Sequence, residues 1–419
     1  MRSYDKRPPR VPPITRIELT DDKKTLRLVL LAACIAIAVL AFTIGIISAL
    51  TTEPGWQIIE TDSADLNCSN DFVLNYYLGA GELSATEEQK ALRMLYTEAT
   101  EKAFLLFHST HLTEQYYNLA YISAHPNEVI AVDPVLYEAF VQIQNAQNRC
   151  LYLGPAYIEY DRIFACEADI QAEGFDPAKN AEQASYVGKL AEFANDPGHI
   201  DLELLENSQV RLHISSEYQS YIAENELTRL LDLGWMKNAF IVDFLADTLQ
   251  NAGFSNGYLA SYDGYTRNLD ARGEQYSFNI FNRDGNNIDL PAVFRYKKPT
   301  AIVYLRDYPM SQQDSGQYYV YASGETVTTF IDPADGMEKN ALHNLVSYSE
   351  KGGCARLALE MSAVFLQDAV TADVLNGLTE SEIYSIWFAD LTLCYNQKDM
   401  DLQLLTTEGV TYTTAYAGK

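Results

Sequence analysis

A lysine and two aspartates, with a glycine nearby, lie within one short segment, DLGWMKNAFIVD, which runs from Asp232 to Asp243. A reaction at a pyrophosphate needs glycine so that backbone N–H groups can approach, a cation to take up the charge, and a base for the attacking hydroxyl. Gly234 and Lys237 are residues of the first two types, and Asp243 could hydrogen-bond a ligand. Each also has a plainer interpretation, because a loop lysine is usually solvated and an aspartate at a helix start is often a structural cap.

This segment resembles DLGGIAKGYAVD of the FAD:protein FMN transferase (ApbE) family when the two are aligned without gaps. The identical positions are Asp232, Leu233, Gly234, Val242 and Asp243. The lysine falls one position early, so that Asn238 stands where the family has lysine. Trp235 stands where the family has the second glycine of the loop. The pattern indicates a retained scaffold with an altered site.

Further segments resemble the family and follow its order along the chain. They are Asn118 with Val129–Phe140, Gly154–Asp161, Ala252–Gly264 and Thr328–Gly336. Gly264 is retained in the third of them, and Asp332 with Pro333 matches the HHIIDPxTG signature in the last. Together with Asp232–Asp243 they cover most of residues 70–367, which predicts the family's fold.

The resemblance also implies a reaction and its cofactors. The family hydrolyses FAD with Mg²⁺ and transfers the FMN half to a Ser or Thr hydroxyl of an acceptor protein outside the cytoplasm. FAD and Mg²⁺ are thus the implied cofactors, and an exported flavoprotein is the implied partner. The implied flavin contacts are Asp232, Gly234, Asn238, Asp243, Gly264 and Asp332. Asp332 followed by proline also fits a simple turn.

Most positions that would carry catalysis are changed. The family's SGD triplet falls at Leu305–Asp307, where only Asp307 remains, and its signature histidine is replaced by Thr329. The family's metal-binding Asp/Thr pair is missing from Cys354–Ser362, where Glu360 is the only acid. A single carboxylate binds Mg²⁺ poorly without further oxygen ligands. The resemblance therefore predicts the fold more strongly than the activity.

An apolar run near the start of the chain predicts a membrane anchor. Leu28 to Leu50 is a run of 23 residues without a charge, which is long enough for a transmembrane helix. Residues 1–27 carry eight basic and four acidic side chains, and positive flanks stay in the cytoplasm. We expect a cytoplasmic tail at 1–27, the transmembrane helix at 28–50, a stalk at 51–65 and an extracytoplasmic domain at 66–419.

Charge and cysteine content exclude other classes of site. The residues after position 27 include 22 basic and 53 acidic ones, so phosphate backbones would be repelled and nucleic-acid binding is excluded. No CxxC or paired Cys/His spacing indicates a structural zinc site. His108 and His111 stand three apart, a spacing that permits metal binding, although a surface pair without a third ligand is the simpler interpretation.

The elements that must position these residues form one α+β domain, with helices first and an antiparallel sheet later. Apolar periodicity, caps and proline positions predict helices at 87–107, 134–147, 239–252, 354–367 and 381–387, and Asp133 is the expected cap of the helix at 134–147. Alternating β-rich runs predict strands at 210–214, 276–280, 292–296, 301–305 and 318–322.

Three functional hypotheses follow. The preferred one is a membrane-anchored, catalytically degenerate ApbE-like protein that binds a ligand or partner in the flavin cleft. The second is an active transferase with displaced groups, in which Lys237 and Asp307 are catalytic and Glu360 binds metal. The third is a cell-envelope binding protein that uses no flavin.

Overall fold

The computed structural model describes residues 28–35, 37–39, 52–62, 68–285, 287–406 and 409–418. The chain divides into two units, one up to Glu53 and one from Pro54 onwards. In the first unit, residues 28–35 and 37–39 are helical and exposed. Among the described residues, no helix is both long and apolar enough to cross a membrane. Most of the predicted span from Leu28 to Leu50 lies outside the described residues.

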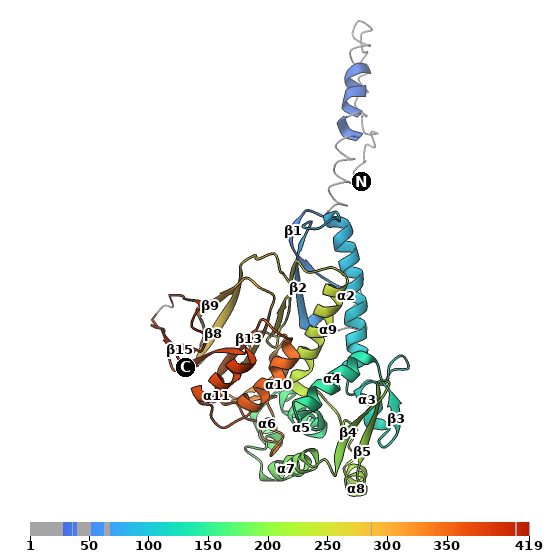
Figure 1. The fold of residues 1–419 in the computed structure, drawn as a ribbon, viewed down its shortest axis with the longest axis vertical. Coiled ribbons are helices and arrows are strands. Elements are labelled where there is room, and N and C mark those ends of the chain that lie inside the picture. The colour runs from blue at the N-terminus through green and yellow to red at the C-terminus, as the bar shows by residue number, and fades with distance from the viewer. Residues whose placement is uncertain are drawn as a thin grey trace, which may run out of the picture. The chain divides into compact units, whose positions relative to one another are not determined.

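The second unit is built on a nine-stranded sheet (Figure 1). Its spatial order is β1 (Gly55–Ile59), β2 (Phe72–Leu78), β6 (Gly257–Ser261), β7 (Tyr265–Asn268), β10 (Thr300–Arg306), β13 (Asn344–Ser349), β14 (Tyr384–Ala389), β15 (Thr392–Tyr395) and β17 (Thr413–Tyr416). All neighbours are antiparallel except β15 and β17, which are parallel. Alternation sets the faces, since β2 buries every second side chain.

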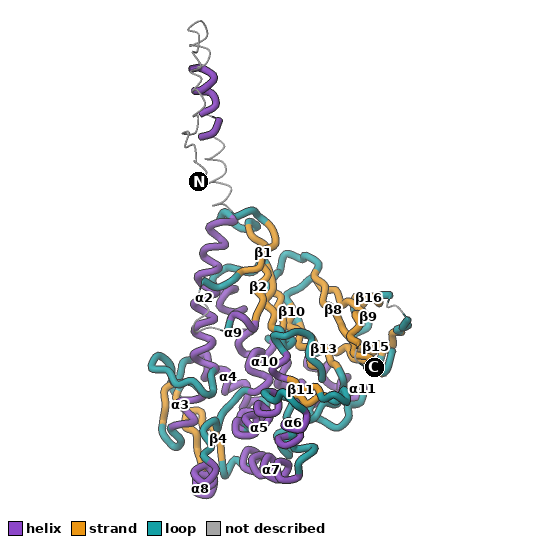
Figure 2. Tube along the Cα trace, turned by 180° about the vertical axis from the view of Figure 1, so that it is seen from behind, coloured by secondary structure: helices purple, strands orange, loops and turns teal. Residues whose placement is uncertain are grey.

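Helices cover one face of this sheet. The main ones are α2 (Ala85–Phe107), α9 (Lys237–Asn251) and α10 (Cys354–Phe365). Figures 1 and 2 show α2 and α9 running side by side, in agreement with their contacts. A capping box formed by Ser84 and Glu87 begins α2, which satisfies two backbone donors of its first turn. The large core lies between these helices and the sheet.

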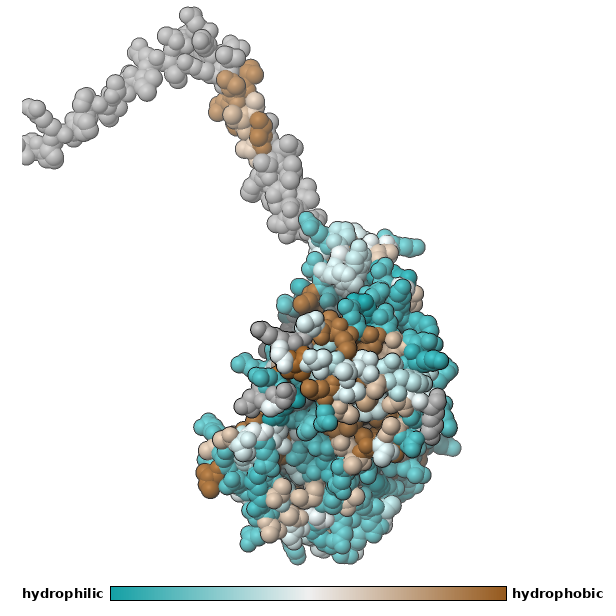
Figure 3. Space-filling view, turned by 90° about the vertical axis from the view of Figure 1, so that its left-hand side faces the viewer, coloured by the Kyte–Doolittle hydropathy of each residue, from teal (hydrophilic) through white to brown (hydrophobic). Residues whose placement is uncertain are grey.

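A three-stranded sheet covers part of the other face. It consists of β8 (Tyr276–Asp284), β9 (Asn287–Tyr296) and β16 (Asp401–Leu404). Ile280 and Phe294 from this sheet pack with Ile302 and Val346 in a second, smaller core. Figure 3 shows a mostly polar surface on the side of β8 and β9, with hydrophobic residues gathered in its middle.

The remaining elements form a lobe beside the main helices. They include α3 (Leu119–Ala124), α4 (Pro134–Asn145), α5 (Gly154–Phe164), α6 (Asp169–Phe175), α7 (Ala181–Asn195), α8 (Ser216–Asn225) and the small sheet of β3 (Val129–Ala131), β5 (Gln209–Ile214) and β4 (Ile200–Leu205). A hairpin of β11 (Tyr318–Val320) and β12 (Thr326–Thr328) and the short α11 (Ala372–Gly377) complete the fold. The described cysteines are all free.

The structure confirms most predicted elements and corrects others. The helices expected at 87–107, 134–147, 239–252 and 354–367 are α2, α4, α9 and α10, and Asp133 caps α4 as expected. The helix expected at 381–387 is wrong, because Tyr384–Ala389 pairs with β13 as strand β14. The order of helices first and sheet later is also wrong, since β1 and β2 precede α2 in the main sheet.

The segment 51–65, for which a stalk was predicted, contains β1. Gly55–Ile59 pairs along its whole length with β2, and Ile59 is buried. The folded unit therefore begins at Pro54 rather than near Leu66. Local composition with Pro54 and Gly55 indicated a loop, but a partner strand from beyond residue 70 fixes this segment in the sheet.

Candidate functional site

The first half of the Asp232–Asp243 segment lines a cleft of about 480 Å³, which we call the motif cleft. Its wall comes from the end of α2, from α5, from the start of α9 and from the loop before β2. The polar and aromatic residues that matter below are Asp71, His108, Tyr157, Asp161, Arg229, Asp232, Gly234, Trp235, Lys237, Gln317 and Thr329. The cleft thus combines charged groups of both signs with aromatic rings.

Asp232 is held in place by two interactions. Its Oδ2 lies 2.8 Å from Nε of Arg229, and its Oδ1 accepts the backbone N–H of Gly234 at 2.6 Å. Arg229 also pairs through Nη1 with Oδ2 of Asp161 at 2.7 Å. The guanidinium of Arg229 therefore offsets one of the two carboxylate charges, so that the group of three keeps one negative charge, and the Asp232 side chain fixes the turn that leads into α9.

Gly234 is required by packing. Its φ is +54°, in the left-handed region, and a Cβ at this position would lie well inside van der Waals contact of the Tyr157 ring. The glycine therefore lets the backbone lie close to a side chain of α5. Gly234 also lines the motif cleft, and its contact with a flavin stays a prediction.

Lys237 is the first residue of α9 and also lines the motif cleft. Among the described residues, no carboxylate lies within ion-pair distance of its ammonium group. Lys237 also acts on the nearby Asp71, where burial raises the pKa of the carboxyl and the charge of Lys237 partly offsets this effect. Lys237 is therefore a cation at a helix N-terminus with its hydrogen-bonding capacity still available.

His108 ends α2 and is neutral in this environment. Its Nδ1 accepts the backbone N–H groups of His111 at 2.9 Å and Thr110 at 3.2 Å, which leaves the proton on Nε2. Burial is the main cause that lowers the pKa of this imidazole. In the part of the chain that the structure describes, no group of three His, Cys, Asp or Glu residues is arranged to hold a metal ion. The metal interpretation of His108 and His111 therefore has no support.

Trp235 fills space that a glycine would leave open. Only 3% of its surface is exposed, its ring packs edge-on against Phe330 at 5.3 Å, and its backbone oxygen accepts the Tyr265 hydroxyl at 2.8 Å. Within the described residues, the buried indole N–H has no hydrogen-bond partner. Thr329, which stands at the family's histidine, lines the same cleft.

Asn238, at the family's lysine position, does not line the cleft. It is buried, and its Nδ2 donates to Oδ2 of Asp263 at 2.9 Å. Burial raises the pKa of the Asp263 carboxyl, which Asn238 and Gln317 contact by hydrogen bonds. A neutral amide therefore occupies the place where a lysine would meet a carboxylate.

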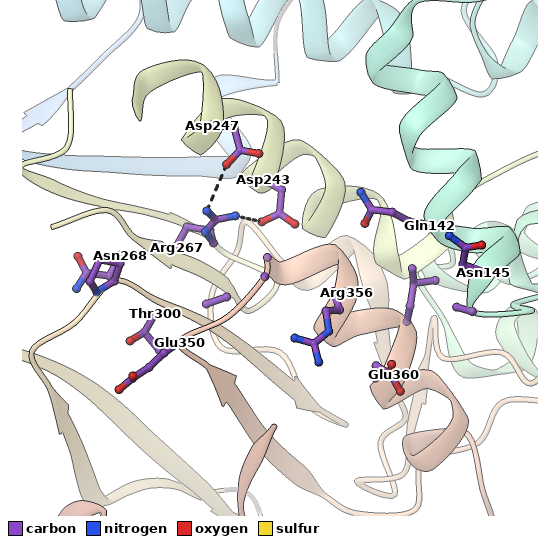
Figure 4. Close-up of a pocket in the computed structure, with 16 residues that line it drawn as sticks. Gln142, Asn145, Asp243, Asp247, Arg267, Asn268, Thr300, Glu350, Arg356 and Glu360 are labelled. Atoms are coloured by element: carbon purple, nitrogen blue, oxygen red, sulfur yellow. Dashed lines mark hydrogen bonds and ion pairs between the residues drawn. The ribbon is translucent and has the colours of Figure 1, made fainter. Parts of the chain in front are cut away.

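Asp243 and Glu360 line a different cavity, of about 700 Å³, which we call the α10 cavity (Figure 4). The backbone N–H groups of Cys354 and Ala355 both donate to the Asp243 carboxylate at 2.8 Å, and Arg267 pairs with it at 2.7 Å. Asp243 thus caps α10 from the neighbouring helix, which confirms its structural role. Its contact with a flavin stays a prediction.

Glu360, the predicted metal ligand, stands on the exposed side of α10. Figure 4 shows its carboxylate apart from Asp243 and Asp247, which flank Arg267. Glu350, the remaining acid of the α10 cavity, pairs with Lys298 at 2.6 Å. The described carboxylates here are thus either paired or separated, and they do not form the oxygen cluster that Mg²⁺ prefers.

Asp307, predicted to be a catalytic residue, lies in a third cavity of about 390 Å³ that shares no lining residue with the motif cleft. Its Oδ2 is 2.6 Å from Nδ1 of His343, and this hydrogen bond is the main cause that raises the pKa of the histidine. His343 was not identified from the sequence, because 36 residues separate the pair. Arg306 pairs with Asp314 in the protein interior.

Gly264 and Asp332 shape turns. Gly264 has a φ of +113°, and a Cβ would collide with the backbone oxygen of Tyr304. Asp332 accepts the N–H of Ala334 at 2.9 Å and pairs with Lys339 at 2.7 Å, as the turn interpretation predicts. Of the predicted site residues, the structure brings together only Asp232, Gly234 and Lys237 in the motif cleft.

Sequence reasoning missed several cleft residues. Asp71, Tyr157, Arg229 and Gln317 come from segments far apart in the chain, and none of them was singled out as a site residue. Only Arg229 offered a signal, since an arginine three residues before Asp232 is well placed to pair with it.

Comparison with known proteins identifies the fold. No protein-family model and no curated protein sequence matches this chain. The solved ApbE protein of Thermotoga maritima is similar in structure, with a TM-score of 0.54, 11% identity and coverage of 84% of this chain and 97% of that chain. The flavin transferase ApbE from Vibrio cholerae has a TM-score of 0.52 and 12% identity, with coverage of 80% and 93%. The chain therefore has an ApbE-like fold, as predicted.

Proposed function

We propose that this chain is a membrane-anchored, extracytoplasmic protein with an ApbE-like fold that binds a ligand in the motif cleft and does not transfer flavin. The main support is the pair of residues at the family's glycine and lysine positions. Trp235 is buried and fills the loop, and Asn238 is bound to Asp263. A reaction at a pyrophosphate lacks its expected cation at this position.

The other predicted catalytic groups are dispersed. Lys237 lines the motif cleft, Glu360 lines the α10 cavity, and Asp307 lines the third cavity. Catalytic groups must be held together at the reacting atoms. This separation favours loss of catalysis over an active transferase with displaced residues. The membrane anchor rests on the uncharged run from Leu28 to Leu50 and its basic flank.

The cleft itself supports a ligand-binding role. Lys237 offers a positive charge, and the N–H of His108 and the side chain of Gln317 are further polar groups in the wall. Phe104 and Phe107 provide apolar area in the same cleft. A few polar groups in a partly apolar cleft are typical of small-molecule sites. We propose that the ligand carries a negative charge that faces Lys237.

Two measurements test this function. Residues 54–419 are incubated with FAD, Mg²⁺ and a Ser/Thr acceptor peptide, with the flavin transferase ApbE from Vibrio cholerae as positive control. We expect no FMN on the peptide, and transfer by this chain would refute the proposal. Titration with FAD, followed by flavin fluorescence, then separates the remaining hypotheses, since absence of binding leaves a cleft that takes a ligand other than flavin.

Two substitutions test whether Asn238 and Trp235 are the reason for the expected lack of FMN transfer. Asn238→Lys places an ammonium group beside Asp263, and Trp235→Gly reopens the loop. If the two substitutions together confer measurable FMN transfer, the degenerate interpretation is strengthened. If Lys237→Ala abolishes an activity of the unmodified chain, the second hypothesis of an active transferase is correct instead.

A further inference from the structure

The edge strand β1 carries two large apolar side chains on its outer face. Trp56 is 46% exposed and Ile58 is 61% exposed, while Ile59 points into the core. The Trp56 ring contacts Tyr77 of β2 and Tyr276 of β8 edge-on, with centroids 5.6 Å and 5.9 Å apart. We call Trp56, Ile58 and Tyr77 the β1 face. Its rings are held by packing, so the exposed area is preformed.

The β1 face follows the predicted membrane anchor closely in the sequence. Gly55, its first strand residue, follows Leu50, the end of the uncharged run, by five residues. Five residues reach at most roughly 18 Å when fully extended. With the proposed anchor ending at Leu50, this length of chain is the tether that would connect β1 to the bilayer surface.

The chemistry of the β1 face suits the headgroup region of a bilayer. Tryptophan and tyrosine are enriched at membrane interfaces, where one end of the ring is apolar and the other is wet. The guanidinium of Arg272 lies 5.1 Å from the Tyr77 ring centre and pairs with the buried Asp270 at 2.7 Å. This part of the face therefore adds polar contacts without a net charge.

The negative charge of the chain determines which class of lipid the β1 face can contact. Glu53 and Glu60 are exposed on either side of β1, and the chain as a whole has a formal net charge of −27. Carboxylates next to β1 in the chain and a strongly negative net charge disfavour contact with anionic lipids. A zwitterionic surface carries no such penalty.

We propose that the β1 face rests in the headgroup region of a zwitterionic lipid bilayer, with Trp56 and Ile58 inserted at the interface. This inference rests on the membrane anchor of the proposed function. It assigns to β1 the role of setting the folded unit against the membrane.

Tryptophan fluorescence tests the inference directly. The chain has three tryptophans, and Trp235 and Trp387 are only 3% and 6% exposed. The full chain is reconstituted in phosphatidylcholine vesicles with and without lipids brominated near the headgroup. We expect the brominated lipid to quench part of the emission, and the Trp56→Phe variant to lose that part. The Trp56→Phe/Ile58→Trp variant should regain it.

A matched control places a tryptophan elsewhere on the folded unit. Ile170 is 77% exposed and lies on α6, which Figure 1 shows in the lower part of the folded unit, well away from β1. In the Trp56→Phe background, Ile170→Trp should show no quenching by the brominated lipid. Equal quenching at position 170 would overturn the inference, since it would report unspecific contact with vesicles.

Flotation of the vesicles keeps the two proposals apart. A chain that floats with the vesicles but is not quenched refutes the lipid contact and leaves the anchor intact. A chain that does not float refutes the anchor and the inference with it. An emission shift that depends on protein concentration and not on lipid assigns the β1 face to a second copy of the chain and also overturns the inference.

Discussion

At the scale of single residues, a polar side chain is available to a ligand only when its hydrogen bonds are not already used. Asn238 is committed to Asp263, and Asp243 is committed to Arg267 and to two backbone N–H groups. Lys237 lies next to Asn238 in sequence and has no such commitment among the described residues. Within one segment, Asn238 and Asp243 therefore stabilise the fold, whereas the neighbouring Lys237 remains able to bind a ligand.

Gly234→Ala tests how strictly packing dictates this loop. The new Cβ meets the Tyr157 ring at a left-handed φ, so we expect a loss of about 2–5 kcal/mol in the free energy of unfolding. Gly253→Ala is the matched control, because its φ is also positive but nothing lies within 4 Å of the added Cβ. It should cost only about 1 kcal/mol. Urea unfolding measures both, and equal losses would contradict the packing argument.

The residue scale also shows what sequence reasoning can reach. The Asp332 turn was predicted because its partners lie within a few residues. Asp243 was assigned a cap or a flavin contact, but its actual partners at Cys354 and Ala355 lie more than 100 residues away. Long-range partners of this kind leave no periodic signal in one sequence.

At the scale of elements, the junction of α9 and α10 depends on Asp243. Asp243→Ala leaves the Cys354 and Ala355 N–H groups without an acceptor and Arg267 without its main partner. We expect a loss of about 3–5 kcal/mol in unfolding free energy. Asp247→Ala removes the other carboxylate that pairs with Arg267. Because the Asp247 side chain is 60% exposed, this substitution should cost less than about 1 kcal/mol in unfolding free energy. Similar losses in the two variants would show that Asp243 is not the cap of α10.

The turn after β12 gives a pH dependence. Burial raises the pKa of Glu338 to about 8, and the carboxyl accepts the Thr328 N–H at 2.9 Å. Between the ordinary value of 4.5 and about 8, the folded chain therefore holds a proton that the unfolded chain releases. Stability falls as pH rises through this range, since the native state binds more protons.

Glu338→Gln should remove this dependence, because an amide keeps an acceptor oxygen without ionising. We expect the thermal midpoints of wild type and variant to be close at pH 5 and the variant to be the more stable at pH 9. Glu360→Gln, at an exposed site on α10, is the control and should show no such divergence. A constant difference between wild type and Glu338→Gln across this pH range would contradict a raised pKa.

Elements were predictable where the apolar pattern is local and long. The stripe of α2 and the cap of α4 were read correctly, because each is complete within its own segment. The strand at Tyr384–Ala389 was predicted to be a helix. Its alternating residues Tyr384, Ile386 and Phe388 are too few for a clear strand pattern, and the strand is stabilised by pairing with β13.

At the scale of the whole molecule, the residues shared with the family are those that the backbone requires. Gly234 and Gly264 have positive φ and no room for a Cβ, and Asp243 joins two helices. The positions that changed include Trp235 and Thr329, which line the motif cleft. This division explains why short motifs led to an ApbE-like fold although no family model matches the chain.

The extent of the folded unit gives the last prediction. A fragment that begins at Pro54 keeps β1 and should unfold like the full chain, whereas a fragment that begins at Glu60 loses the strand that pairs with β2. It also loses the burial of Ile59, which is 2% exposed, and opens the edge of β2. We expect a loss of roughly 2–4 kcal/mol in unfolding free energy and a tendency to aggregate. Equal urea midpoints for the two fragments would restore the interpretation of this segment as a stalk.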